Sequence, residues 1–226
     1  MEKFDAYVEA NADRFIEELK TFCRQPSIAA QGIGLEEMGH LVRARLEKLG
    51  AEVRLIPVDD GPPVIYAELG DGQRTLLLYN HYDVQPPDPL NLWDSEPFDP
   101  QVREGKLYGR GVADDKGDLL ARLQAIEAYQ ATLGELPLKI KCVFEGEEEV
   151  GSPHLASFAA EHAELLAADG CLWETGRKDE SGRPTIALGL KGIMYLEMRA
   201  HGAKSDLHSS LATLVPNQQF PFWLSA

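Results

Sequence analysis

The sequence predicts an α/β fold with helices on the faces of a sheet, for two reasons. Short β-like runs separated by Gly- and Pro-containing turns alternate with amphipathic helical stretches. Polar clusters with His, Asp and Glu follow predicted strands, where open α/β sheets place their ligand-binding loops. The 226 residues are 44% hydrophobic and 26% charged, which is the composition of a globular protein.

Two helices are predicted before the first strand. Apolar residues recur at roughly helical spacing over about residues 5–24, and Pro26 ends this stretch. A second apolar stripe covers 35–49, and Gly50 stands where a C-cap glycine belongs. We therefore expect one long helix and then a shorter one.

A group of strands and a long loop follow. Turn residues at 60–63 and 70–72 separate runs typical of strands. The segment 80–100 is rich in Pro and Asp and reads as a long ordered loop, a type of segment that is often functional. The three predicted strands lie at 52–58, 64–69 and 74–79.

The next part of the chain alternates helix and strand. A helix is predicted at 118–133 and an alternating strand at 138–144. Ser152 and Pro153 are suitable N-cap and first-turn residues for a second helix that reaches residue 167. The short apolar run at 170–173 predicts a buried strand.

The pattern changes after residue 177. A polar link at 178–184 precedes two runs typical of strands, at 185–190 and 193–200. We therefore divide the chain into a first domain at 1–183 and the beginning of a second at 184–226.

Charge and composition exclude several classes of function. The formal net charge of −15 makes nucleic acid an unfavourable partner. No apolar run approaches the ~20 residues that cross a bilayer, and the charged N-terminus lacks the apolar region of a secretory signal. The cysteines are too few and too scattered for a disulfide framework, so we expect buried thiols in a cytoplasmic protein. They are Cys23, Cys142 and Cys171.

Four polar clusters carry the candidate chemistry, and we expect them to meet at one edge of the sheet. They contain one imidazole and several carboxylates, a mixture that suits zinc and related divalent ions. The clusters lie at 80–83, 109–117, 145–152 and 173–176.

Spacing and charge alone suggest a role for each of these side chains. Asp83 lies two residues after His81, so its carboxylate could orient the imidazole. Three further carboxylates and a bridging hydroxide would balance the charge of two divalent ions, which together activate water. These carboxylates are Asp114, Glu149 and Glu174. Glu148 would then be the base that takes the proton from that water.

Each feature also has a purely structural interpretation. A histidine at a strand end is more often structural than a ligand, and an Asp pair before a helix is often an N-cap. A run of Glu is often the solvated first turn of a helix. Paired carboxylates could also serve metal-free chemistry such as glycoside hydrolysis. The joint occurrence of the four clusters favours the metal site.

Six segments, taken in order, resemble the M20 family of dinuclear zinc peptidases, and its dipeptidase branch most closely. The resemblance covers about residues 10–217, and the segments are jointly specific. They are 81–86 (HYDVQP), 93–98 (WDSEPF), 105–111 (GKLYGRG), 114–117 (DDKG), 148–152 (EEVGS) and 206–210 (DLHSS).

The resemblance implies a ligand set for the two metals. His81 and Glu174 would bind one zinc, and Asp83 would support His81. Asp114 would bridge both ions, and Glu149 would bind the second. The ions would be zinc, with manganese or cobalt as alternatives. The fold implied is a mixed sheet flanked by helices, followed by an α+β lid domain.

The resemblance also implies the reaction and its other participants. Glu148 would act as general base and acid in hydrolysis of a peptide, such as a dipeptide, or of an N-acyl amino acid. His208 matches a lid histidine that steadies the oxyanion in the partner's site of dimeric relatives. The peptide bond between Asp114 and Asp115 would be cis, and the family implies a homodimer.

Members of the family are about twice as long as this chain, and we expect a C-terminal truncation. The absent part would supply the last histidine ligand of the second zinc and an arginine for the substrate carboxylate. The atypical segment 218–226 supports this expectation. The alternative function is therefore a catalytically incompetent fragment of such an enzyme.

Overall fold

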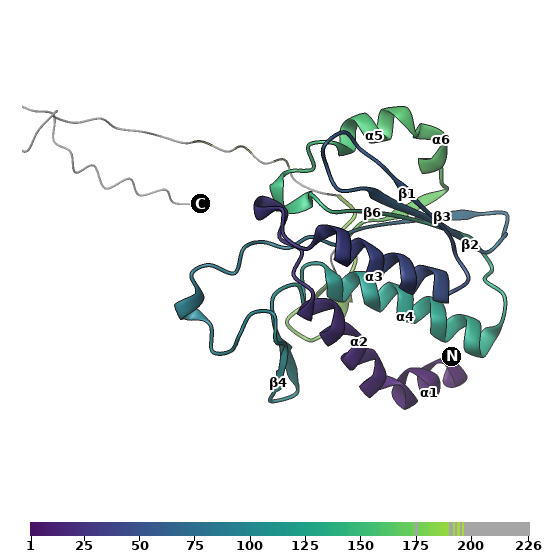
Figure 1. Ribbon diagram of the computed structural model, residues 1–226. Helices are drawn as coiled ribbons and strands as arrows, with labels where there is room; N and C mark the ends of the chain where they lie inside the picture. Colours follow the sequence, from purple (N-terminus) through teal and green to yellow (C-terminus); the bar gives the residue numbers. More distant parts are fainter. Residues whose placement is uncertain (175, 190–191, 193, 195, 197–226) are drawn as a thin grey trace, which may run out of the picture. The chain divides into compact units, whose positions relative to one another are not determined.

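The computed structural model describes residues 1–174, 176–189, 192, 194 and 196, and divides the chain into the units Met1–Thr185 and Ile186–Ala226 (Figure 1). All the helices and strands of the described residues lie in the first unit. Its α-helices are α1 (Glu2–Ala10), α2 (Ala12–Arg24), α3 (Leu35–Lys48), α4 (Lys116–Leu133), α5 (Leu155–Glu161) and α6 (Ala163–Leu166). Its strands are β1 (Glu52–Ile56), β2 (Val64–Leu69), β3 (Thr75–His81), β4 (Gln101–Arg103), β5 (Lys106–Tyr108), β6 (Lys139–Glu145), β7 (Gly170–Leu172), β8 (Arg177–Lys178) and β9 (Pro184–Thr185).

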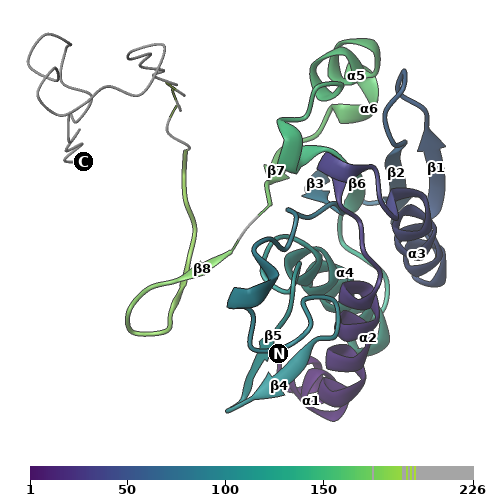
Figure 2. The ribbon, with the colours of Figure 1, turned by 60° about the vertical axis from the view of Figure 1, so that its left-hand side comes forward.

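A five-stranded mixed sheet forms the centre of this unit, in the order β1-β2-β6-β3-β7. Strands β1, β2 and β6 pair antiparallel, whereas β3 runs parallel to both β6 and β7 (Figure 2). The predicted α/β class with a mixed sheet is therefore confirmed. The carboxyl ends of β3, β6 and β7 all face one edge, and the register pairs His81 with Glu145.

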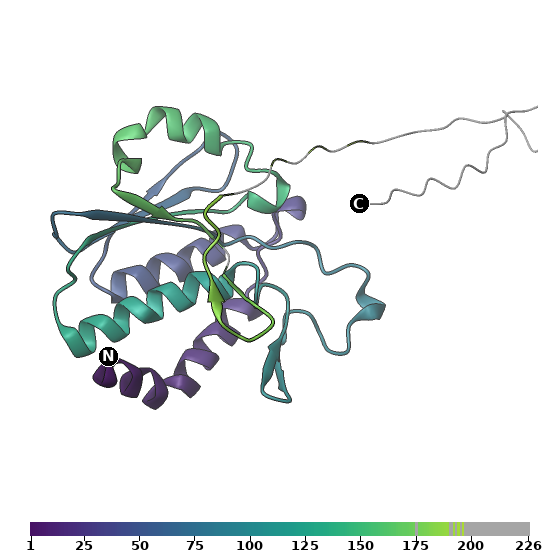
Figure 3. The ribbon, with the colours of Figure 1, turned by 180° about the vertical axis from the view of Figure 1, so that it is seen from behind.

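Helices cover both faces of the sheet. On one face, α2, α3 and α4 pack on a core of buried aliphatic and aromatic side chains, and α1 packs against α4 (Figure 1). On the other face, α5 and α6 cover a smaller cluster around Phe158 and Val143 (Figure 3). The larger core includes Phe22, Met38, Val42, Leu46, Ile65, Leu78, Leu119, Leu123, Cys142 and Phe144.

The predicted single helix at 5–24 is wrong, because the chain breaks at Asn11 into α1 and α2. Asn11 leaves the helical region, with φ −108° and ψ 5°. Its side-chain Nδ2 donates to the Tyr7 carbonyl at 2.8 Å, and its Oδ1 accepts from Arg14 Nε at 3.1 Å. A short amide side chain thus competes with the backbone for hydrogen bonds, which apolar periodicity does not reveal. The second predicted helix is confirmed, and Gly50 has the positive φ of 84° expected after a helix end.

The helix predicted from residue 152 begins later and is interrupted. Ser152 is not its N-cap, since it has φ 48° and its hydroxyl donates to Glu145 Oε1 at 2.8 Å. His154 occupies the N-cap position of α5, and the helix breaks at His162 before α6. The segment between β6 and α5 is instead a loop that runs past the end of the sheet.

The strand predicted at 170–173 forms as β7, but it is not buried. Among the described residues it is the edge strand, pairs only with β3, and leaves Cys171 and Leu172 exposed. The expected burial of the cysteines therefore holds for Cys23 and Cys142 but not for Cys171, and all three are free thiols.

The second predicted domain lies mostly outside the described residues. Strands β8 and β9 form a small hairpin, and residues 186–189 contain no strand, in contrast to the prediction for 185–190. Most of the strand predicted at 193–200 falls outside the described residues, and the division at 183/184 stays a prediction. Among the helices that the structure describes, none is long and apolar enough to cross a bilayer.

Candidate metal centre

His81 stands at the carboxyl end of β3 with its side chain only 1% exposed. Its Nδ1 atom lies 3.2 Å from both the carboxylate Oδ1 and the backbone oxygen of Asp83. Asp83 is itself fully buried. In this contact Nδ1 carries a proton and donates it in a hydrogen bond to Asp83, while Nε2 faces the acidic loops. A metal-binding histidine with a supporting carboxylate has the same arrangement.

Carboxylates from three other loops surround His81 Nε2. Asp114 Oδ1 lies at 2.9 Å, Glu174 Oε2 at 3.6 Å and Glu148 Oε2 at 3.8 Å. Asp114 precedes α4, Glu148 follows β6 and Glu174 follows β7. Because the carboxyl ends of these parallel strands share one edge, the sheet brings together residues that are far apart in sequence.

Two triads in the described part of the chain have ligand atoms within 4.8 Å of one another. One joins His81 to Asp114 and Glu149, and the other joins it to Asp115 and Glu174. All four predicted ligands occur in these groups. Asp115, in contrast, was not expected to face the site.

Two of these carboxylates have a buried oxygen without a hydrogen-bond partner among the described residues. They are Asp115 Oδ1 and Glu174 Oε2. Burial raises the pKa of Asp115 to about 6, against the hydrogen bonds from Asn80 and His81, and raises the pKa of Glu174 to about 7. A buried carboxylate oxygen without a hydrogen-bond partner is unfavourable unless a cation compensates it, so this donor set fits a metal ion.

The protonation of His81 and Asp114 also reflects their contact. Burial by itself lowers the pKa of His81, but the hydrogen bonds to Asp114 and Asp83 outweigh it and raise the pKa to about 11. The same contact with His81 lowers the pKa of Asp114. The proton on His81 Nε2 forms a hydrogen bond to Asp114 Oδ1. A metal ion bound to Nε2 would displace this proton.

Asp83 connects two of the loops. Its Oδ1 accepts the Glu148 N–H at 3.2 Å and its Oδ2 accepts the Glu149 N–H at 3.1 Å. The same carboxylate thus orients the His81 ring and fixes the backbone that carries the two glutamates. The sequence predicted only the first of these roles.

We expect Asp83→Asn to weaken zinc binding by about 10–100-fold, the usual effect of losing a carboxylate behind a ligating histidine. The amide keeps the shape, but it loses the charge and replaces one acceptor oxygen with a donor. Zinc titration against a competing chelator would measure the effect. Asp179→Asn, in the exposed turn of the β8–β9 hairpin, is the control, and equal zinc affinity in both variants would contradict this role.

Further side chains that the sequence did not single out complete the site. Gln85 Nε2 donates to both Oε2 and the carbonyl of Glu149, each at 2.9 Å.

Glu147, the neighbour of Glu148, does not face His81 but contacts His154 Nδ1 at 2.7 Å through its Oε2. The bond between Asp114 and Asp115 is cis, as the resemblance implied. Gln85 and Asp115 lie within the segments 81–86 and 114–117 that carry the resemblance, which implied no metal-binding role for either.

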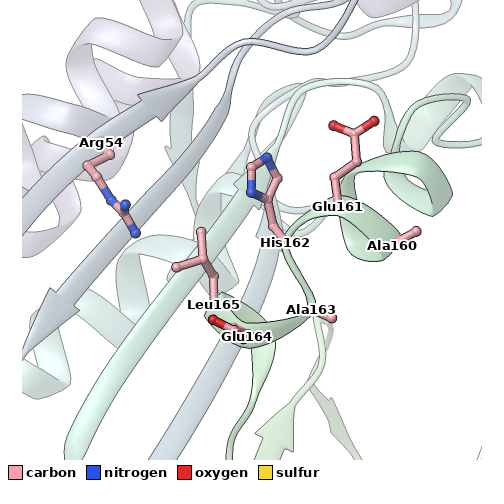
Figure 4. Close-up of a pocket in the computed structure, with 7 residues that line it drawn as sticks. All are labelled: Arg54, Ala160, Glu161, His162, Ala163, Glu164 and Leu165. Atoms are coloured by element: carbon pink, nitrogen blue, oxygen red, sulfur yellow. The ribbon is translucent and has the colours of Figure 1, made fainter.

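Two surface pockets formed by described residues lie away from this cluster. One of about 440 Å³ is lined by Arg54 of β1, by residues of α5 and α6, and by His162 between these two helices (Figure 4). Another of about 620 Å³ lies between the start of α3 and the turn at 60–63. Neither of these two pockets includes a residue of the metal-binding triads.

Comparison with known proteins identifies the family. Residues 77–218 match the family described as Peptidase family M20/M25/M40. The chain belongs to this family. The family is one of peptidases, and M20 metallopeptidases bind metal ions.

The similar proteins with known names include dipeptidases. The chain is 31% identical over 232 residues to a Cys-Gly metallodipeptidase of Schizosaccharomyces pombe, covering 93% of this chain and 48% of that protein. It is 32% identical over 233 residues to the human Beta-Ala-His dipeptidase, covering 92% of this chain and 45% of that protein. The chain thus spans about half the length of these curated relatives.

Solved structures of M20 proteins share the fold. A metallo-carboxypeptidase from Sulfolobus solfataricus is 38% identical, with a TM-score of 0.74 over 90% of this chain and 47% of that one. Human carnosine dipeptidase 1 is 32% identical, with a TM-score of 0.73 over 76% of this chain and 40% of that one. The sheet and helices described above are therefore those of an M20 peptidase.

Proposed function

We propose that this M20 protein hydrolyses a peptide bond, with a dipeptide or an N-acyl amino acid as substrate, at a site that holds two divalent metal ions. The observation that carries the proposal is the convergence of His81 with carboxylates from three further loops. Two of these carboxylates have buried oxygens that lack a partner among the described residues. The names of the dipeptidase relatives support the substrate class.

We assign the ligands as the sequence predicted. His81 and Glu174 would hold one ion, Glu149 would hold the other, and Asp114 would be a ligand of both. Mixed imidazole and carboxylate ligands suit zinc, with manganese or cobalt as alternatives. Asp83 orients His81, and Gln85 restrains Glu149 through the hydrogen bonds given above.

Glu148 is the general base. When bound, a metal pair lowers the pKa of water and polarises the scissile carbonyl. Glu148 takes the proton from the attacking water and delivers it to the leaving amine. Burial raises the pKa of Glu148, and the nearby Glu149 and Asp114 raise it further, against the influence of His81. A raised pKa brings a carboxylate closer to the neutral range, where it can both accept and release a proton.

Other parts of the proposal lie beyond the described residues. His208, the oxyanion-stabilising residue implied by the resemblance, is outside them, as is most of the lid domain. The homodimer and the cytoplasmic location also stay predictions. A gel-filtration mass measurement at several concentrations would test the dimer.

The first experiment is the metal content of the protein purified without chelators. We expect about two zinc, manganese or cobalt ions per chain, and hydrolysis of a dipeptide that stops on chelation and returns with added metal. Elemental analysis and a dipeptide panel measure both. A folded chain that binds no metal, or whose hydrolysis survives the chelator, would contradict the proposal.

A further inference from the structure

We propose that Arg122 is a positioning residue that sets the place of Glu174 relative to His81. The inference rests on the proposed function, in which these two side chains share an ion. Strand β7 pairs with β3 only over Gly170–Leu172, so the pairing ends two residues before Glu174. Something other than the strand ladder must therefore hold Glu174 near His81.

The Arg122 guanidinium spans the ends of the two strands. Its Nη1 donates to the Tyr79 carbonyl of β3 at 2.7 Å and approaches the Leu172 carbonyl of β7 at 3.3 Å. Its Nη2 donates to the carbonyl of Trp173, the residue directly before Glu174. Arg122 belongs to α4, which packs on the sheet. Its hydrogen bonds therefore connect the ends of both strands to this helix.

An aromatic contact supports the same segment. The Trp173 ring stacks on the Tyr79 ring, with centroids 3.8 Å apart and planes inclined by 17°. Arg122 and this stack thus hold Trp173 from its backbone and its side chain. Trp173 is 44% exposed despite this stack, so the Arg122 contacts to the backbone add a restraint that the ring contact does not supply.

Arg122 also reaches the other side of the site through Asn80. Nη1 donates to Asn80 Oδ1 at 2.7 Å, and Asn80 Nδ2 donates to Asp115 Oδ2 at 2.7 Å. Asp115 Oδ2 further accepts the His81 N–H at 3.1 Å. One guanidinium therefore orients the amide that holds Asp115, while Asp115 Oδ1 stays without a partner. Lysine cannot reproduce this, because the contacts need the planar, forked donor set of arginine.

The test is zinc binding by the full 226-residue chain and its Arg122→Met and Arg122→Lys variants. We expect Arg122→Met to lower the affinity for one of two zinc ions by about 10–100-fold, as for other residues that orient ligands. The affinity for the second ion should change much less. Arg122→Lys retains the charge and should still lower the affinity for the first ion by about tenfold. Titration with a competing chelator gives both affinities, and the absorption of bound Co²⁺ reports the ligand geometry.

Arg45→Met is the matched control. Arg45 is buried, whereas Arg122 is half-buried, and it joins helices through Glu18 Oε1 at 2.8 Å and Glu127 Oε2 at 2.5 Å. These contacts do not include the ends of β3 and β7. Its loss should lower the thermal stability without changing zinc affinity. A merely structural role for Arg122 would give the same result as Arg45.

The outcomes separate the two proposals. If the unaltered chain binds none of zinc, manganese or cobalt, the proposed function fails and the inference fails with it. If the unaltered chain binds zinc and Arg122→Met binds it equally well, the inference alone is overturned. If Arg122→Met does not fold, Arg122→Lys decides, and an unchanged zinc affinity and Co²⁺ spectrum would overturn the inference.

Discussion

Glu148→Gln should reduce kcat for dipeptide hydrolysis by about 10²–10⁴-fold while leaving the bound metal in place. Glutamine keeps the size of the side chain but cannot accept the proton from water. Glu148 Oε2 lies 3.8 Å from His81 Nε2, farther than Asp114 at 2.9 Å, and Glu148 belongs to neither metal-binding triad of the described residues. It is therefore placed beside the metal ligands and is free to exchange protons.

The control for this variant is Glu147→Gln. Glu147 is the adjacent carboxylate, but its side chain contacts His154 and not His81. We expect it to retain most of the activity. Elemental analysis of both variants separates loss of the base from loss of the metal. Full activity in Glu148→Gln, or loss of its metal, would show that the base has been assigned to the wrong residue.

His81→Ala should abolish stable metal binding, an effect larger than the roughly 10–100-fold loss for residues behind the ligands. Both metal-binding triads contain His81, so one substitution removes a ligand atom from each. It also leaves Asp114, Asp115 and Glu174 without the imidazole that faces them. The measurement is metal content after dialysis against metal-free buffer, with circular dichroism to verify the fold.

His154→Ala is the matched control for the loss of an imidazole. His154 also lies between carboxylates, with Nδ1 at 2.7 Å from Glu147 and Nε2 at 3.2 Å from Asp60, but it is outside the triads. We expect it to retain the full metal content. If His81→Ala also retained two ions, the carboxylates would suffice, and the assignment of His81 as a ligand would be wrong.

Local patterns predicted most of the elements around the site. Helices α3 and α4 agree with the apolar periodicity, since each buries a face against the core. Strand β3 agrees with the short apolar run between turn residues, and it is buried on both faces at its carboxyl end. The periodicity failed where a polar side chain formed a local alternative. Asn11 divides the first helix, and Ser152 turns toward Glu145 instead of capping a helix.

The sequence by itself determined the fold class, the loops that carry His81 and the acids, and their order along the chain. These features depend on residue type and local spacing. Only the tertiary structure decided which oxygens face His81 Nε2, that Asp115 turns inward, and that Arg122 joins the ends of β3 and β7. The physical reason is that these contacts connect residues more than thirty positions apart. Their distances follow from the order β6-β3-β7 in the sheet, which no local pattern specifies.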